Sequence, residues 1–221
     1  MNNMKIAIDG PGGAGKSTIA KAAAKALGLI YIDTGAMYRA VALYAIRKGV
    51  NTETEAVDAL LPEVEITIQH EGDTQRIYLC GEDVSDQIRT PEISVGASKV
   101  AVRPAVRLKL VELQRALAKT NNVIMDGRDI GTYVLPDADL KIFLVADEQE
   151  RARRRYKELL EKGEKCSFDE VLLDLQFRDK NDASRAFAPL KQAEDAVLLD
   201  STTLSLAETV ERVITMIKGK M

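Results

Sequence analysis

A glycine-rich segment near the start of the sequence carries the clearest chemical signal. Residues 10–18 read GPGGAGKST and fit the pattern G-x-x-x-x-G-K-[ST]. Its defined positions are held by Gly10, Gly15, Lys16 and Ser17. An apolar run at 6–8 precedes the segment and an alanine-rich run at 19–27 follows it, so it has the strand, loop and helix context that the pattern needs. An incidental glycine-rich turn would not explain those flanks.

Each residue type in this loop suits the binding of a nucleotide phosphate. Glycines let successive N–H groups approach an anion without a Cβ in the way, and the positive end of the following helix faces it. Lys16 is placed to reach the β- and γ-phosphates, and the Ser17 hydroxyl is placed to bind Mg²⁺. We therefore expect the phosphates of ATP to be held by Gly10, Pro11, Gly12, Gly13, Ala14, Gly15, Lys16, Ser17 and Thr18.

The composition is that of an ordinary soluble globular protein. The chain has 221 residues, of which 46% are hydrophobic and 29% charged, and its formal net charge of −3 gives no global attraction to nucleic acid. Cys80 and Cys166 lack the spacing of metal ligands. No apolar run approaches the roughly 18 residues of a membrane span, and the first strand leaves no room for a signal peptide. We expect a cytoplasmic monomer with no nucleic-acid or membrane partner.

Short apolar runs alternate with helical patterns along most of the chain. Strands are expected at 6–8, 29–32, 123–125, 140–146 and 196–199, and helices at 19–27, 36–48, 97–119, 148–161, 168–178 and 206–217. Between 62 and 89, a period-two alternation with a turn at 71–73 predicts an antiparallel hairpin with a third strand at Val84. The predicted fold is a single α/β three-layer sandwich of the P-loop NTPase type. Its five-stranded parallel sheet has helices on both faces and a small antiparallel β insertion.

Aspartates stand at four of the five expected strand ends. They are Asp9, Asp33, Asp126 and Asp200. Ligands of a parallel sheet bind at this edge, and one acid is needed there near a metal ion. Asp126, which closes an apolar strand, is the best candidate to support the Mg²⁺ bound by Ser17. A helix cap or turn former is the alternative for Asp126.

Arginines recur beside these strand ends. They are Arg39, Arg128, Arg178 and Arg185, with Arg151, Arg153, Arg154 and Arg155 crowded at the start of one helix. A protein that already holds a triphosphate needs more cations when a second anion is bound or a phosphoryl group is transferred. The alternative for the crowded helix is a solvated face with ion pairs such as Arg154–Glu158 and Lys157–Glu161.

Residues for nucleophilic catalysis are missing from the sequence. The only histidine, His70, lies at the predicted hairpin turn and is expected to be a plain surface residue. The sequence also shows no His/Cys spacing of a metal cluster. Transfer between phosphates needs neither, because the acceptor oxygen of a phosphate dianion is already ionised.

Several segments together resemble the bacterial cytidylate kinases. They are residues 10–18, 33–39, 126–132, 178–182, 185–190 and 200–202, which occur in the order found in that family. The resemblance runs from about residue 4 to residue 218, and GRDIGT and RAFAPL are its most specific parts. It implies transfer of the γ-phosphoryl group of ATP, with Mg²⁺, to CMP or dCMP.

The resemblance also implies a role for individual residues. Arg39, Arg128 and Arg185 would hold the CMP phosphate; Ser98, Arg107 and Asp129 would read cytosine, with Asp129 accepting from the exocyclic amine. Asp182, helped by Arg178, would bind the sugar, and Thr34, where many relatives have serine, would lie beside the acceptor. The catalytic cations would be Lys16, Arg128, Arg185 and Arg154, although Arg153 or Arg155 could replace Arg154. Residues 62–93 would shape the acceptor site, and residues 150–185 would form a mobile helical lid.

Other classes of protein share the phosphate-binding loop. A GTP-binding switch protein needs the guanine reader Asn-Lys-x-Asp, which the segment 179–182 does not fit. An ATP-driven motor normally has an Asp-Glu pair at the second acidic strand, whereas Gly127 follows Asp126. A P-loop kinase for another small phosphate acceptor is the alternative most similar to a cytidylate kinase. The residues that would read the base distinguish the two.

Overall fold

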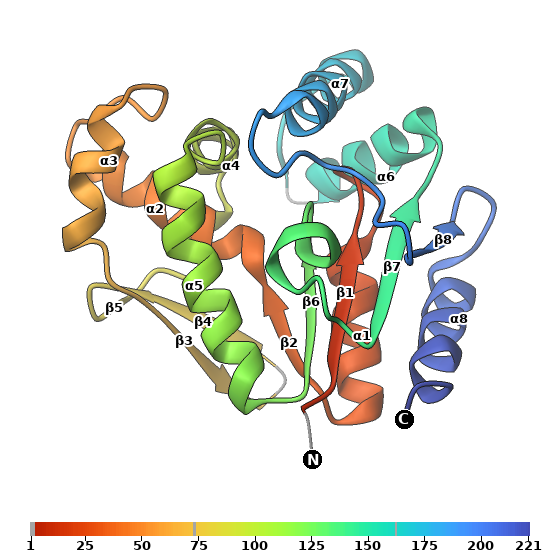
Figure 1. The fold of residues 1–221 in the computed structure, drawn as a ribbon. Helices are drawn as coiled ribbons and strands as arrows, with labels where there is room; N and C mark the ends of the chain where they lie inside the picture. Colours follow the sequence, from red (N-terminus) through yellow and green to blue (C-terminus); the bar gives the residue numbers. More distant parts are fainter. Residues whose placement is uncertain (1–2, 73, 162) are drawn as a thin grey trace.

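A five-stranded parallel sheet forms the centre of the computed structural model, which describes residues 3–72, 74–161 and 163–221 (Figure 1). Its strands are β1 (Lys5–Asp9), β2 (Ile30–Asp33), β6 (Val123–Gly127), β7 (Leu140–Val145) and β8 (Val197–Asp200). Their order is β2-β6-β1-β7-β8, and every neighbouring pair is parallel. The predicted sheet is confirmed, and its carboxyl ends meet at one edge.

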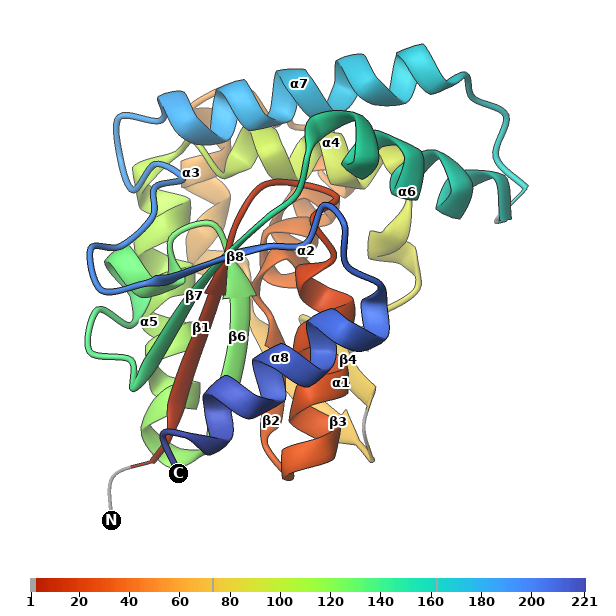
Figure 2. The same ribbon diagram turned by 90° about the vertical axis from the view of Figure 1, so that its right-hand side faces the viewer.

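Helices cover both faces of the sheet, as the alternation of apolar patterns predicted. Helices α1 (Lys16–Leu27) and α8 (Leu206–Lys218) lie on one face, and α2 (Thr34–Arg47) and α5 (Pro104–Thr120) lie on the other (Figures 1 and 2). Successive residues of β1 serve the two layers, because Ile6 and Ile8 pack in the core with α1 and α8 while Ala7 packs in the core with α2 and α5. Strands β1, β6 and β7 are buried on both faces, which explains their continuous apolar runs, whereas Val197 and Leu198 of β8 are exposed.

A second, antiparallel sheet is inserted between α2 and α5. It consists of β3 (Ile66–Glu71), β4 (Thr74–Leu79) and β5 (Glu82–Asp83) in the order β3-β4-β5. Ile77, Leu79 and Val84 are buried in the same core as α2. The hairpin and a third strand are confirmed, with that strand ending just before Val84. The short helix α3 (Ala56–Leu60), which precedes the hairpin, was not predicted.

The helical region expected over 97–119 consists of two helices. Helix α4 (Pro91–Val100) begins after Thr90, whose side chain accepts a hydrogen bond from Ile93 N. Helix α5 starts at Pro104, and Arg103 before it has an extended backbone with ψ 120°. Proline has no N–H to donate and disfavours a helical conformation in the preceding residue, so the chain breaks there.

Two helices lie across the carboxyl edge of the parallel sheet. They are α6 (Glu148–Glu161) and α7 (Phe168–Ser184), and Figure 2 shows α7 stretched over the sheet edge with α6 beneath it. Helix α7 runs six residues past its predicted end at Arg178. None of the helices in the described parts of the chain combines the length and apolar character needed to cross a bilayer.

Candidate active site

The glycine-rich loop leaves β1 in close contact with β7. Gly10 has a φ of 150°, and a Cβ placed on it would lie 2.0 Å from the carbonyl oxygen of Leu144. Only glycine fits there without moving backbone. At the other end of the loop, Gly15 caps α1 in the left-handed conformation, and no side-chain acceptor occupies the cap. The first N–H groups of α1 are therefore directed at the space where an anion would bind.

Lys16 is held beneath this loop and is only 5% exposed. Its Nζ donates to the carbonyl oxygen of Pro11 over 2.7 Å. Burial, together with the nearby guanidinium of Arg128, lowers the pKa of Lys16 to about 7. A phosphate dianion would reverse that shift, so the site favours an anionic ligand.

The structure places Asp126 next to Ser17. Ser17 Oγ donates to Asp126 Oδ2 over 2.8 Å, and the hydroxyl of Tyr31 donates to Asp126 Oδ1 over 2.8 Å. Burial, followed by repulsion from Asp33, raises the pKa of this carboxyl group. Thr34, expected beside the acceptor, is buried and donates its hydroxyl to the Asp126 carbonyl oxygen.

Arg128, Asp182 and Arg185 form one cluster beside the loop, in which Asp182 is buried and Arg128 is half-buried. Arg128 Nε donates to Asp182 Oδ2 over 2.7 Å, and Arg185 Nη2 donates to the other carboxylate oxygen. Burial would raise the pKa of Asp182, but the two arginines hold it below its usual value. A Cβ on Gly12 would lie 3.8 Å from Arg128 Nη2, so this cluster borders the phosphate-binding loop.

Arg107 and Asp129 form a second buried ion pair. Arg107 is 1% exposed, donates to Asp129 Oδ2, and lies 5.6 Å from the centre of the Tyr38 ring. The segment that carries Asp129 is fixed by Asp9, which accepts from Ile130 N over 2.8 Å and from Gly131 N over 2.7 Å. Burial raises the pKa of Asp9 to about 6.

Arg39 lies against a third aspartate. Its Nη2 donates to Asp33 Oδ2 over 2.8 Å, and Arg89 Nη1 reaches the same oxygen over 3.1 Å. Asp33 pairs with Asp126 in the β2–β6 register, so Arg39 belongs to the same edge of the sheet as Ser17.

Three of these arginines hold a buried N–H group without an acceptor. Among the described residues, the buried polar side-chain atoms without a partner include the Nε atoms of Arg39, Arg107 and Arg185. Leaving such a donor unpaired costs about 1–3 kcal/mol. All three residues are predicted acceptor-site residues, so the orphan donors fit a site built for an anionic or polar ligand.

Arg178, Ser98 and His70 lie outside the ion-pair clusters described above. Arg178 pairs with Asp174 over 2.9 Å, one helical turn earlier, and makes no bond to Asp182. Ser98 lies half-buried on α4, which contacts α7. His70 is exposed, as expected, with Nε2 2.9 Å from the Tyr31 carbonyl oxygen.

The arginines at the start of α6 do not behave alike. Arg153 is exposed and lies 3.4 Å from Glu150, whereas Arg154 pairs with Glu150 over 3.0 Å and also donates Nη2 to the Ser201 carbonyl oxygen over 2.8 Å. The expected pair Arg154–Glu158 is wrong, since Glu158 pairs with Arg155. The expected Lys157–Glu161 pair is present at 3.9 Å.

Sequence reasoning gave no role to several residues that build the site. Tyr31 orients Asp126, Asp9 holds the Asp129 segment, and Asp179 and Arg151 join α7 and α6 to the loop. Asp9 was noted only as a strand-end acid, and Asp179 could have been noted from position because it lies one helical turn from Asp182. The contacts of Tyr31 and Arg151 join segments that are distant in sequence.

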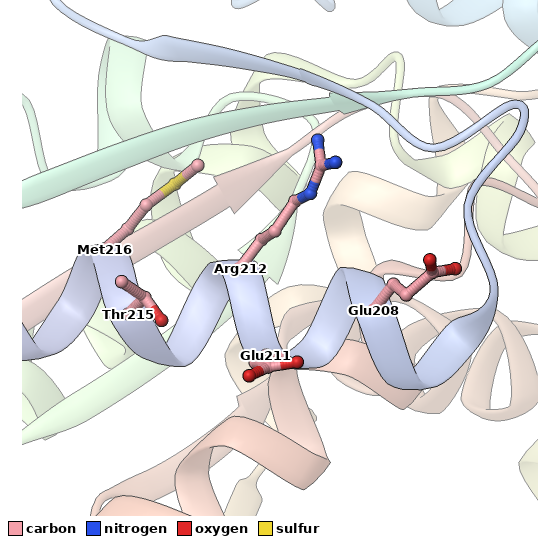
Figure 3. Close-up of a pocket in the computed structure, with 5 residues that line it drawn as sticks. All are labelled: Glu208, Glu211, Arg212, Thr215 and Met216. Carbon is pink, nitrogen blue, oxygen red and sulfur yellow. The ribbon is translucent and has the colours of Figure 1, made fainter.

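A hollow on α8 is lined by none of these residues (Figure 3). It is lined by Glu208, Glu211, Arg212, Thr215 and Met216. Glu208 already accepts a hydrogen bond from Ser205 N over 2.8 Å, and the two carboxylates would repel a phosphate. The hollow therefore does not resemble the anion site at the sheet edge.

A loop built for one polyphosphate, beside arginines suited to a second anion, is the arrangement of P-loop kinases. Sequence comparison is more specific: the family model described as cytidylate kinase matches residues 6–219. The chain belongs to the cytidylate kinase family.

Curated relatives match the chain over nearly its whole length. It is 50% identical over 216 residues to the cytidylate kinase of Thermosipho melanesiensis, covering 98% of this chain and 97% of the relative. It is 51% identical to that of Desulfitobacterium hafniense, covering 99% and 94% of the two chains. A crystal structure of an uncharacterized protein from Eubacterium ventriosum has the same general fold, with a TM-score of 0.57 at 11% identity and coverage of 98% and 99%.

Nucleotide binding should draw a proton onto Lys16 in alkaline solution. In the free site its pKa is about 7, and bound phosphates would restore the charged form. We expect uptake of up to about one proton when ADP binds at about pH 8, and much less at about pH 6, where Lys16 is already protonated. Calorimetric titrations in buffers of different ionisation enthalpy measure this uptake. Lys16→Met should abolish it, and equal uptake in that variant would contradict the assignment.

Proposed function

We propose that this protein transfers the γ-phosphoryl group of ATP to CMP or dCMP, giving ADP and CDP or dCDP. The observation that carries the proposal is the pairing of a phosphate-binding loop with arginines whose buried Nε–H donors have no acceptor. Membership of the cytidylate kinase family supports CMP as the acceptor. It does not support a GTP-binding switch or a kinase for another small acceptor.

Residues 10–18 would hold the ATP phosphates, with Mg²⁺ beside Ser17. Ser17 Oγ and the Asp126 carboxylate are oxygen ligands of the type that Mg²⁺ prefers, and they lie 2.8 Å apart. In the described residues no group of three or more His, Cys, Asp or Glu side chains could enclose a metal ion. Phosphate and water would therefore supply most of the ligands. When bound, the ion neutralises charge on the phosphate oxygens.

The phosphate of CMP would be held by Arg39, Arg128 and Arg185. Each of these guanidinium groups now pairs with a carboxylate, and Arg39 and Arg185 each keep a free Nε–H. Planar guanidinium groups bind phosphate oxygens in bidentate fashion, so the phosphate can use the donors that the aspartates leave unbonded. Asp182 would then accept from the sugar hydroxyls, with Arg178 turning from Asp174 to assist.

Cytosine would be read by Asp129, Arg107 and Ser98. The carboxylate of Asp129 accepts from Arg107 and can accept a second bond from the exocyclic amine of cytosine. Uracil presents a carbonyl oxygen at that place, which a carboxylate repels. A buried reader of this kind discriminates strongly, because the wrong base leaves its polar groups unpaired.

The chemical step requires positioning and charge neutralisation by this chain. Lys16, Arg128, Arg185 and Arg154 would surround the transferred group, and the acceptor oxygen needs no general base because it is already ionised. Residues 150–185, which include most of α6 and all of α7, would act as the lid that excludes water, and residues 62–93 would shape the acceptor side.

The reaction would take place in the cytoplasm within a single chain. Cys80 and Cys166 are free thiols, which suits a reducing compartment. All of the residues proposed to bind the two substrates come from one chain, so a monomer would suffice.

The proposal is tested by measuring ADP formation from ATP·Mg²⁺ with single acceptors. We expect rapid turnover with CMP and dCMP, slow turnover with UMP, AMP and GMP, and almost none without an acceptor. Equal ADP release with and without acceptors would mean that the loop serves hydrolysis, and the kinase proposal would fall.

Asp129→Asn should change the choice of base. Asparagine keeps an oxygen that can accept from Arg107, while its amide can donate to the carbonyl oxygen of uracil. We expect the ratio of kcat/KM for CMP to that for UMP to fall by about tenfold or more, which is 1.4 kcal/mol. The matched control is Asp200→Asn, at a strand end where the carboxylate accepts hydrogen bonds from Thr202 N and Oγ1. An unchanged ratio in a folded Asp129→Asn protein would show that Asp129 does not read the base.

A further inference from the structure

Asp179 on α7 makes direct contact with the phosphate-binding loop. Its Oδ1 accepts from Gly12 N over 3.2 Å, and its Oδ2 accepts from Arg151 Nη1 over 2.5 Å. Arg151 Nη1 also donates to the Gly12 carbonyl oxygen over 2.9 Å. The carboxylate, the guanidinium and the N–H and C=O groups of Gly12 therefore form a closed ring.

This ring joins three segments that are far apart in sequence. Arg151 is 6% exposed, and its Nε donates to the Ala146 carbonyl oxygen over 3.0 Å, which fixes the guanidinium to the end of β7. A Cβ on Gly13 would lie 3.2 Å from the carbonyl oxygen of Arg151, so the start of α6 lies directly against the loop. Asp179 is the residue through which α7 joins this contact.

Asp179 and Asp182 lie on the same face of α7, because they are three residues apart. Asp182 bonds to Arg128 and Arg185, which we assign to the acceptor phosphate. Leu175, one turn before Asp179, adds apolar packing, with a side-chain carbon 3.3 Å from where a Gly12 Cβ would lie. One helix face thus contacts the donor loop through Asp179 and the acceptor site through Asp182.

We propose that Asp179 is a positioning residue that, with Arg151, ties α7 to the phosphate-binding loop and so holds Asp182 and Arg185 in line with the donor phosphates. This inference rests on the proposed kinase function. The reacting groups of two substrates must be aligned closely, and a misplacement of about 1 Å can cost about a hundredfold in rate. Asp179 would act through α7 on the acceptor, while the remaining loop N–H groups and Lys16 still bind the donor.

Asp179→Asn tests this role with little change in shape. The amide oxygen can still accept from Gly12 N, but the charge that pairs with Arg151 is lost. We expect kcat to fall and KM for CMP to rise, so that kcat/KM for CMP drops about tenfold to a hundredfold. The KM for ATP and the affinity for ADP should stay within about twofold, because the rest of the loop is intact. The control is Asp169→Asn, an exposed residue of α7 ten positions earlier, which should match the unmodified protein.

Asp179→Glu supplies a rescue test. Its carboxylate can pair with Arg151 again. Asp179→Glu should therefore recover part of the kcat/KM for CMP that Asp179→Asn loses. If Asp179→Asn binds ADP more weakly but keeps its kcat/KM for CMP, the inference is overturned, because Asp179 would then only shape the loop. Normal kinetics in all variants would overturn it as well.

Amide hydrogen exchange in α7 tests this inference independently of the proposed function. If Asp179 ties α7 to the loop, amides of α7 should exchange faster in Asp179→Asn than in the unmodified protein or in Asp169→Asn, whatever reaction is catalysed. Unchanged exchange in α7 would overturn the tie. Failure of the unmodified protein to use CMP would remove the acceptor role assigned to Asp182 and Arg185, while faster exchange in Asp179→Asn would still support the tie itself.

Discussion

The structure depends on the pairing of charged side chains that are buried at the carboxyl edge of the parallel sheet. Lys16, Arg107 and Asp182 are each at most 5% exposed, and an isolated ion at such a position would be far too costly. Each of them has a partner. Lys16 donates to a loop carbonyl oxygen, Arg107 pairs with an aspartate, and Asp182 accepts from two arginines. Much of the architecture around the site serves to bring these partners together, including Asp9 under the Asp129 segment and α7 above the loop.

These ion pairs explain how the site can be ready for phosphate and still be stable without it. A guanidinium group that already lies against a carboxylate is desolvated and oriented, so little reorganisation is needed when phosphate oxygens arrive. The unbonded Nε donors of Arg39 and Arg185 indicate that the carboxylates satisfy these arginines only in part. The lowered pKa of Lys16 likewise indicates an incompletely satisfied cation, because a bound anion would stabilise its charged form.

The sequence predicted the fold better than it predicted the side-chain partners. The phosphate-binding loop, the parallel sheet and the inserted hairpin follow from local patterns of glycine and apolar residues, which act over a few positions. Pro104 marks the start of α5 locally, but the extent of α4 before it did not follow from the apolar stripe, which lies after Pro104. The Arg107–Asp129 pair, the contact of Arg154 with Ser201 and the Asp179–Arg151 ring depend on how distant segments pack, and local spacing does not encode that.

The most direct test of the account is a crystal structure with ADP·Mg²⁺ and CMP bound. The account predicts that the CMP phosphate lies within hydrogen-bond distance of Arg39, Arg128 and Arg185, that the Nε atoms of Arg39 and Arg185 gain acceptors, and that the cytosine amine meets Asp129. A CMP phosphate bound elsewhere, with the three arginines still bonded only to Asp33 and Asp182, would contradict it.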